Sequence, residues 1–329
     1  MTLNRNLSSD MNILLVLFGI AALFEILGWL LMGQSFLFNT KRLTIIFLQV
    51  SIIGIIAVGV TQVIITSGID LSSGSVVAMS AMVAASFAQA SGGFMMYFGG
   101  ISDLPVIIPI FIGIAVGCAA GWFNGAITAY TGIPPFIPTL GMLVAARGIA
   151  VLYNDGSPII GLTENFKFIG SGIMPVIIFI SVAFIFHILL TRTVYGRRTY
   201  AIGSNEEAAR VSGINIKSHK VLVYTLAGGL AGLAGVVMCA RATLAQSGMG
   251  QMYELDAIAA AVIGGTSLFG GRGRITGTVI GVIILGVIMS GFTFLRVDFY
   301  YQEIAKGLII LSAVIVDQYR HNRSVGGAS

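Results

Sequence analysis

Charged side chains are scarce in this sequence. Asp, Glu, Lys and Arg make up only 9% of its 329 residues, whereas they make up about a quarter of an ordinary soluble domain. Hydrophobic residues make up 56%, and the mean hydropathy is +0.95. The composition therefore excludes a soluble globular domain. It predicts an all-α polytopic membrane protein, because helices satisfy their own backbone hydrogen bonds in lipid.

Cysteine and the common catalytic motifs are also scarce or missing. Cys118 and Cys239 lie in apolar runs without metal-ligand spacing, so neither a disulfide framework nor a metal site is expected. The sequence has no H-E-x-x-H, no G-x-S-x-G and no G-x-x-x-x-G-K-[ST]. We therefore expect no catalytic residue, no nucleotide site and no cofactor bound by this chain.

Apolar runs fill most of the chain. A spanning helix needs about 20 mainly apolar residues, and ten runs approach that length: 12–32, 43–67, 73–91, 105–130, 136–153, 173–190, 220–244, 256–269, 275–295 and 303–318. The first is long enough to span and lacks a convincing cleavage site, so we expect it to remain as the first helix. The eighth is short, so a tilted, buried or re-entrant helix is expected there. We predict a single transmembrane domain over residues 1–329.

The basic residues are distributed unevenly between the loops. If the N-terminus is cytoplasmic, the cytoplasmic loops hold most of the cations, among them Arg192, Arg197, Arg198, Arg210, Lys217, Lys220, Arg272 and Arg274. The positive-inside rule then places both termini and residues 191–219 in the cytoplasm. The net charge of +5 needs no nucleic acid to explain it.

The longest clearly polar segment is Thr199–Lys217. Asn205 is a suitable N-cap for a helix of about two turns, and Gly213 is a suitable left-handed C-terminus. Glu206 and Glu207 put negative charge on the first turn, where the helix dipole favours it. Ala208, Ala209 and Val211 are suited to pack on a neighbour, and the charges of this helix, including Arg210, are suited to pair with a partner. A helix this short needs support, so either a docking element or a solvated loop fits the pattern.

Two acidic breaks precede Ala/Ser-rich helices. Asp70 lies in the polar segment 68–75 and is a ready N-cap for the third helix, either at the membrane edge or at a broken helix deeper in the bilayer. Glu254 and Asp256 open the eighth helix in a similar way. The predicted topology puts the two breaks on opposite sides of the membrane, which is the pattern of an inverted internal repeat.

Small residues mark two helix faces. Glycines at 113, 117, 121 and 125 form one stripe, and Gly228, Ala231, Gly232 and Gly235 form another; each predicts close packing on another helix. Asn124, beside the first stripe, must bond a neighbour or line a wet cavity. Arg147 needs a carboxylate or carbonyl groups, and Glu25 is one candidate partner.

Several motifs, taken in order, resemble one family. They are GIDLSSG from Gly68, Asn124-Gly125, PFIPTLG from Pro135, AIGSN from Ala201, Ala208-Ala209, Ser212-Gly213-Ile214 and YELDAIAA from Tyr253 with Gly264-Gly265. Together they resemble the permeases of bacterial ABC importers for ribose, xylose, galactosides and inositol, over nearly the whole chain. Pro138 and Arg272 are less usual for that pattern.

The resemblance implies about ten helices per chain and a place in the bacterial inner membrane. It also implies three protein partners: a second permease copy, an ATPase subunit with tandem nucleotide-binding domains that carries ATP and Mg, and a periplasmic sugar-binding protein. Residues 203–214 would form the helix that couples to the ATPase. The coupling candidates are Gly203, Asn205, Glu206, Glu207, Ala208, Arg210 and Gly213. The candidates for the translocation pathway are Asp70, Ser72, Ser73, Asn124, Phe136, Glu254 and Asp256.

Several functions stay open at this point. Within the family, the segment 252–267 and the region 121–136 resemble inositol and galactoside permeases most, which favours inositol. An ion-coupled secondary transporter would need a deep carboxylate, for which Glu25 and Asp70 are the candidates. A permease for an amino acid or an autoinducer is a near alternative, and a scaffolding membrane protein is a more distant one.

Overall fold

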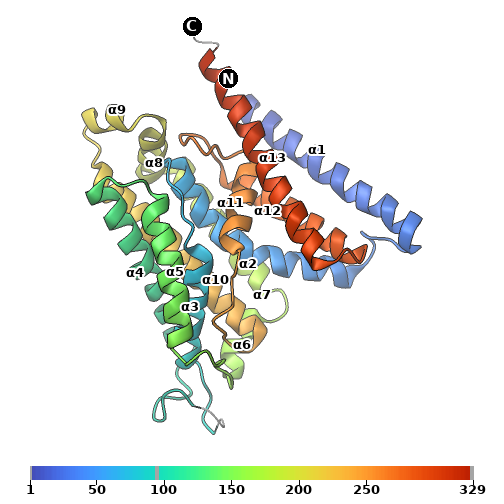
Figure 1. Cartoon of the computed structure of the whole chain (residues 1–329), viewed down its shortest axis with the longest axis vertical. Helices are drawn as coiled ribbons and strands as arrows, with labels where there is room; N and C mark the ends of the chain where they lie inside the picture. Colours follow the sequence, from blue (N-terminus) through green and yellow to red (C-terminus); the bar gives the residue numbers. More distant parts are fainter. Residues whose placement is uncertain (1, 93–95, 327–329) are drawn as a thin grey trace.

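The computed structural model describes residues 2–92 and 96–326, and in these residues the chain is helical, with two isolated β-bridges and no strand. Figure 1 shows the arrangement. The elements are α1 (Thr2–Leu27), η1 (Gly28–Met32), α2 (Thr40–Ile65), α3 (Ser73–Ser86), α4 (Ile107–Thr131), α5 (Phe136–Leu152), α6 (Glu164–Gly170), α7 (Met174–Arg192), α8 (Val194–Ser204), α9 (Glu206–Val211), α10 (Ile216–Ala242), α11 (Tyr253–Ile263), α12 (Ile275–Phe294) and α13 (Phe299–Gly326).

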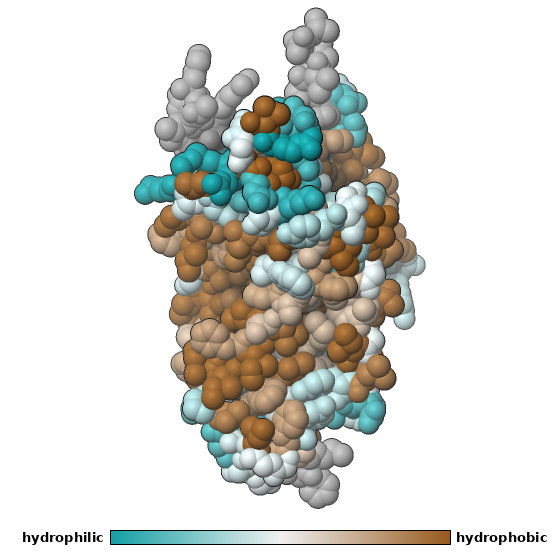
Figure 2. All heavy atoms as spheres, turned by 90° about the vertical axis from the view of Figure 1, so that its left-hand side faces the viewer, coloured by the Kyte–Doolittle hydropathy of each residue, from teal (hydrophilic) through white to brown (hydrophobic). Residues whose placement is uncertain are grey.

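The helices are long and apolar enough to cross a membrane in seven places within the described residues: Met11–Met32, Thr40–Ile65, Ile107–Thr131, Met174–Arg192, Ile216–Ala242, Ile275–Phe294 and Phe299–Tyr319. Figure 2 shows a hydrophobic band of side chains between two more hydrophilic ends. The structure therefore confirms an all-α polytopic membrane protein.

The predicted count of ten spanning helices is not confirmed. Three of the ten runs form short helices: α3 has 14 residues, α5 has 17 and α11 has 11. The apolar residues after α3 and α11 leave the helix and form turns, at 87–91 and 264–269. Hydropathy detects apolar side chains but not the point at which the backbone leaves the helix. The short eighth run was expected to be unusual, and it forms the shortest of the three.

The two small-residue faces pack against each other. A Cβ atom on Gly117 would collide with the carbonyl oxygen of Gly228, and one on Gly121 would collide with that of Tyr224. A Cβ atom on Gly232 would likewise collide with the carbonyl oxygen of Gly113. The backbones of α4 and α10 therefore touch along their length, as the stripes predicted. We call this contact the α4–α10 seam.

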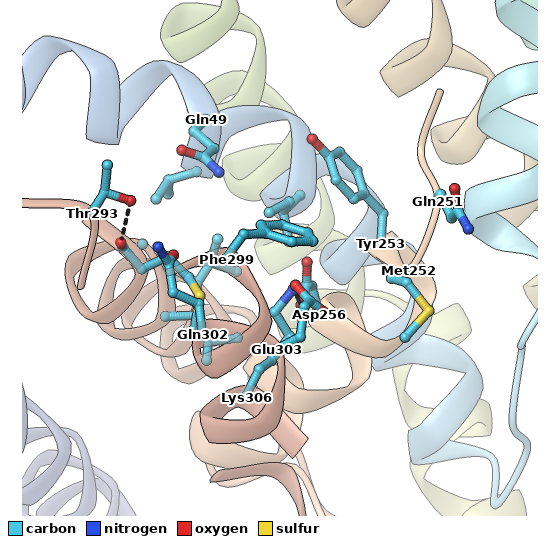
Figure 3. Close-up of a pocket in the computed structure, with 16 residues that line it drawn as sticks. Gln49, Gln251, Met252, Tyr253, Asp256, Thr293, Phe299, Gln302, Glu303 and Lys306 are labelled. Atoms are coloured by element: carbon cyan, nitrogen blue, oxygen red, sulfur yellow. Dashed lines mark hydrogen bonds and ion pairs between the residues drawn. The ribbon is translucent and has the colours of Figure 1, made fainter. Parts of the chain in front are cut away.

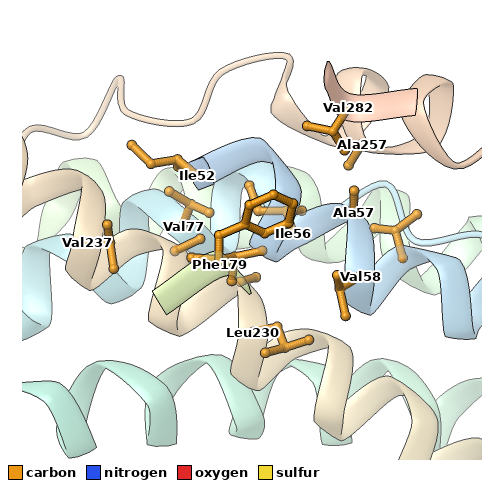
Figure 4. Packing of buried hydrophobic residues seen from close by; sticks show 14 of the residues in the cluster. Ile52, Ile56, Ala57, Val58, Val77, Phe179, Leu230, Val237, Ala257 and Val282 are labelled. Atoms are coloured by element: carbon orange, nitrogen blue, oxygen red, sulfur yellow. The ribbon is translucent and has the colours of Figure 1, made fainter. Parts of the chain in front are cut away.

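The hydrophobic core lies around α2, α3 and α10. Ile55 and Val77 are fully buried, and so is Val237; Figure 4 shows the core from close by, with Phe179 of α7 packed among them. By contrast, α1 and α13 lie together at one edge of the molecule in Figure 1. Their large apolar side chains face outward: Leu15, Phe18, Ile304, Leu308 and Ile315 are all more than half exposed. These surfaces suit contact with lipid.

Candidate functional site

The acidic break before α3 is buried inside the bundle. Asp70 is only 2% exposed, and its Oδ1 atom accepts hydrogen bonds from the backbone N–H (2.9 Å) and the hydroxyl (2.7 Å) of Ser72. Asn124 of α4 donates to the Ser72 Oγ atom at 2.9 Å. Thr139 of α5 and Tyr224 of α10 each donate to the Ile69 carbonyl at 3.3 Å. Three helices thus hold this non-helical segment in place.

The prediction that Asp70 caps α3 is wrong. The helix begins at Ser73, and the residue at the N-cap position is Ser72, which makes no side-chain capping bond. Asp70 lies two residues before that position and closes a local turn through Ser72. An Asp side chain bonds readily to a backbone N–H two residues onward, so the carboxylate stabilises the break itself rather than the helix after it.

The N-termini of α3 and α11 meet inside the molecule. A Cβ atom on Gly74 would collide with the Glu254 Oε2 atom and with the Gly250 carbonyl. Glu254 is 7% exposed. From this meeting point α3 runs toward one end of the molecule, where Gln89 forms a β-bridge with Leu162. Helix α11 leads to the other end, where the Gly271 N–H donates to the Ile65 carbonyl. These opposite courses fit an inverted repeat, but the prediction that the two acidic breaks lie on opposite sides of the membrane is wrong, because they meet inside the molecule. We call this meeting point the junction.

Arg147 of α5 supports the junction from the other side. Its guanidinium donates to the carbonyls of Ser247 and, at 2.8 Å, Met249, and it lies near enough to attract the Glu254 carboxylate. The proposed Arg147–Glu25 pair is therefore wrong.

Glu25 lies at the end of helix α1 and binds its own neighbourhood instead. Its carboxylate accepts from the backbone N–H groups of Phe36 (2.9 Å) and Leu37 (2.8 Å), the Ser35 hydroxyl and the Trp29 indole. This cluster fixes the turn between η1 and α2. The apolar runs of the chain gave no indication of this cluster.

Three buried oxygen atoms around the junction have no hydrogen-bond partner among the described residues: Ser73 Oγ, Asn124 Oδ1 and Glu254 Oε2. A buried polar atom without a partner is costly. Such atoms can receive water or the hydroxyl groups of a solute. Five of the seven predicted pathway residues (Asp70, Ser72, Ser73, Asn124 and Glu254) are thus brought together here.

Two predicted pathway residues lie apart from the junction. Phe136, the first residue of α5, is 46% exposed rather than buried with Ser72 and Asn124. Asp256 lies two residues after Glu254 but pairs with Lys306 of α13 at 3.2 Å. Lys306 also binds Glu303 at 2.9 Å.

The polar segment after residue 199 forms the end of α8 and the short helix α9. Asn205 Oδ1 accepts from the Ala208 N–H at 2.9 Å, and Gly213 has a φ of +83°, so both predicted helix-end roles are confirmed. Glu206 binds Lys220 at 2.6 Å, and Glu207 pairs with Arg210. Ala209 packs with Ile202 and Ile216. Val211, expected to pack, is 81% exposed.

Helix α8 connects α9 to the membrane helices, and the sequence analysis missed it. Ser67, just after α2, donates to the carbonyls of Gly203 (3.3 Å) and Phe269 (3.1 Å). A Cβ atom on Gly203 would collide with the Ile65 carbonyl, so only glycine fits this approach. The one sequence feature that could have indicated α8 is a pattern of small and aromatic residues within a basic stretch.

Tyr200 adds a further link from α8. Its hydroxyl donates to the Gly273 carbonyl at 2.8 Å. Burial raises the pKa of Tyr200, so the hydroxyl keeps its proton and remains a donor. Helix α8 thus contacts the ends of both segments that lead to the junction: Ile65–Ser67 before α3, and the turn 264–274 after α11.

Comparison with known proteins extends over most of the chain. The family described as "Branched-chain amino acid transport system / permease component" matches residues 42–314. The chain is 42% identical over 277 residues to the ribose import permease protein RbsC of Bacillus subtilis, with 82% of each chain covered. It is 43% identical over 293 residues to RbsC of Escherichia coli K12, with 85% of this chain and 86% of the relative covered.

A third relative is the galactose/methyl galactoside import permease protein MglC of Escherichia coli K12. It is 39% identical over 295 residues, with 86% of this chain and 88% of the relative covered. No solved structure matches the chain. The relatives are transport subunits of importers and not enzymes, and their family consists of multi-pass inner-membrane proteins that work with an ATPase and a periplasmic binding protein. The chain therefore belongs to the permease family of ABC sugar importers that includes the ribose and galactoside permeases.

Proposed function

We propose that this chain is the membrane-spanning permease of an ATP-driven importer for a monosaccharide or a cyclitol. The observation that carries this proposal is the identity to ribose and galactoside permeases over more than four fifths of the chain. Ribose and galactose are the first substrates to test, and myo-inositol, which the sequence motifs favoured, is the third.

The coupling segment in this proposal is α8 and α9, and its partner is an ATPase subunit with tandem nucleotide-binding domains. The support is the exposure of α9: Glu206, Glu207 and Val211 all face outward. In Figure 1 the start of α1 and the end of α13 lie at the same end as α9, which fits termini on the ATPase side.

Two further partners are part of the proposal, on the basis of the similarity to importer permeases. A periplasmic sugar-binding protein delivers the solute at the opposite end, where α6 lies. A second copy of the chain completes the translocation path, and the exposed apolar sides of helices at the edge provide surface for it or for lipid.

The coupling mechanism that we propose uses the contacts of α8. When the ATPase moves α9, α8 carries the motion to Ser67 through Gly203 and to the 264–274 turn through Tyr200. These segments lead to α3 and α11, so their N-termini would shift against each other. Access to the buried oxygen atoms of the junction would then alternate between the two sides of the membrane.

The test of function is sugar uptake into proteoliposomes. The complex of this permease, its ATPase and its binding protein should accumulate at least one of ribose, galactose, xylose and myo-inositol, and only when ATP is present. Uptake that continues without the ATPase and the binding protein would contradict the proposal. So would uptake abolished by an ionophore but indifferent to ATP, which would point to an ion-coupled transporter.

The coupling role has its own test. Glu207→Lys should weaken co-purification of the ATPase while leaving the permease folded, because Glu207 is 69% exposed and pairs only within α9. Glu164→Lys is the matched control, since Glu164 is 88% exposed and forms a similar pair with Lys167 on the far end. Equal ATPase recovery from both variants would remove Glu207 from the interface.

A further inference from the structure

A second space, lined by both apolar and polar side chains, lies beside the junction. It is a cavity of about 710 Å³ between α2, α11, α12 and α13. Small-molecule sites in proteins typically enclose about 300–1,000 Å³. Figure 3 shows side chains from α2, α11 and α13 converging on this space.

The floor of the cavity carries charge. Asp256, Lys306 and Glu303 form a chain of two ion pairs, at 3.2 Å and 2.9 Å. The side chains of Asp256 and Lys306 are only 11% and 12% exposed. Asp256 and Lys306 are thus nearly buried, whereas the Glu303 side chain is 30% exposed.

The walls combine amides with aromatic rings. Gln49 of α2 and Gln302 of α13 line the cavity, and so do the rings of Tyr253 and Phe299. The Gln302 Nε2 atom donates to the Val297 carbonyl at 2.8 Å, which holds this amide in place and leaves its Oε1 atom as the acceptor for a solute. Thr293 lies at the rim, where its hydroxyl donates to the Met289 carbonyl at 3.0 Å. Hydrogen-bonding groups beside flat apolar faces suit a solute that has many hydroxyl groups and a C–H face.

Lipid is a poor occupant for this space. Gln49 lies ten residues into a spanning helix and is exposed, whereas Gln302 and Glu303 lie near the beginning of another spanning helix. Gln49 is therefore the side chain that argues against lipid. Polar side chains within membrane segments usually face a water-filled cavity or the interior of a bundle, because facing lipid is costly.

The cavity and the junction share one wall. Glu254 faces the Gly74 end of α3, whereas Asp256, two residues later, faces the cavity. The first turn of α11 therefore separates the cavity from the junction.

We propose that this cavity is a binding subsite for the hydroxyl groups of the neutral sugar or cyclitol, placed next to the junction along the translocation path. The inference rests on the proposed function. Gln302 and Gln49 bind hydroxyls from the walls, Asp256 and Glu303 accept hydrogen bonds at the floor, and Phe299 covers the apolar face.

Cysteine protection tests the subsite. Thr293→Cys in a Cys118→Ala background, assembled with the ATPase, should react with a water-soluble maleimide; Cys239 is fully buried and can stay. The probe is whichever of ribose, galactose, xylose or myo-inositol the wild-type complex imports. At ten times its dissociation constant it should slow labelling about tenfold, since only the free fraction reacts. Ser171→Cys, exposed at the far end of the molecule, is the control whose labelling should not change.

A transport variant makes the test independent of labelling. Gln302→Leu should lower the sugar uptake rate at least about fivefold, comparable to the loss of one hydrogen bond of about 1 kcal/mol. It should keep the ATPase activity that the loaded binding protein stimulates, which shows an intact fold. Gln34→Leu, at an exposed glutamine outside the cavity, should leave uptake unchanged.

The two proposals fail in different ways. If the wild-type complex imports none of the sugars, the proposed function is wrong. If it imports a sugar that neither protects Thr293→Cys nor is slowed by Gln302→Leu, the subsite is overturned while the function stands. A Thr293→Cys that does not react at all also overturns it, because lipid or a second copy then fills the space.

Discussion

The α4–α10 seam and the α1/α13 edge show two ways to place a helix in a membrane. In the seam, glycines bring two backbones into contact, and nearly all the small residues on those faces are buried. At the edge, large apolar side chains face outward, and α13 is anchored by polar contacts such as Lys306–Asp256 and Ser267–Asp317. Lipid is as apolar as leucine, so burial alone does not drive helices together. Close packing fixes the seam, and local polar bonds fix the edge.

The largest effect should come from filling the seam. Gly121→Leu places a side chain against the Tyr224 backbone carbonyl, which cannot move aside without separating α4 from α10. We expect loss of folded protein, measured as detergent-solubilised protein that elutes as a single peak. Gly307→Leu on α13 is the matched control, because a Cβ atom there meets nothing within 4 Å. If both variants fold equally well, the seam is not under tight steric constraint.

A smaller effect should follow from breaking the anchor of α13. Lys306→Met leaves the Asp256 carboxylate nearly buried without its cation, and removing one partner of a buried pair costs about 3–5 kcal/mol. The midpoint of thermal unfolding in detergent should fall. Adding Asp256→Asn to Lys306→Met should recover most of that loss. A double variant as unstable as the single one would show that the pairing itself does not hold α13.

The smallest effect should come from a glycine within the seam itself. A Cβ atom on Gly229 would come too close only to the Cys118 sulfur, whereas one on Gly228 would collide with the backbone of Gly117 and Gly121. We therefore expect Gly229→Ala to lower the unfolding midpoint slightly and Cys118→Ala to restore it, while Gly228→Ala should be far more disruptive. The same unfolding measurement compares all three variants. Equal losses from Gly228→Ala and Gly229→Ala would argue against backbone contact as the cause.

Much of the fold was predictable because its causes are local. Apolar runs indicated the long helices, the spacing of glycines indicated the seam, and Asn205 and Gly213 indicated the ends of α9. Each of these patterns depends on residues close together in the chain.

The rest depends on neighbours that are distant in the sequence. Arg147 binds carbonyls about a hundred residues away, and Asp256 pairs with a lysine on α13. The lengths of α3 and α11 were also missed, because an apolar side chain looks the same in a helix and in a buried turn. The sequence indicated the junction only as two similar acidic breaks, and the fold is needed to show that α3 and α11 meet there.

The meeting of two helix N-termini also has an electrical consequence. Each N-terminus carries about half of a positive elementary charge, so the pair contributes about one, and the Arg147 guanidinium contributes one more. Two carboxyl groups, those of Asp70 and Glu254, lie against them. With both carboxyl groups ionised, the charges nearly cancel. Moving one net charge through 100 mV involves about 2.3 kcal/mol, and a neutral junction avoids that work. A movement of the junction as one unit would then proceed at nearly the same rate whatever the membrane potential.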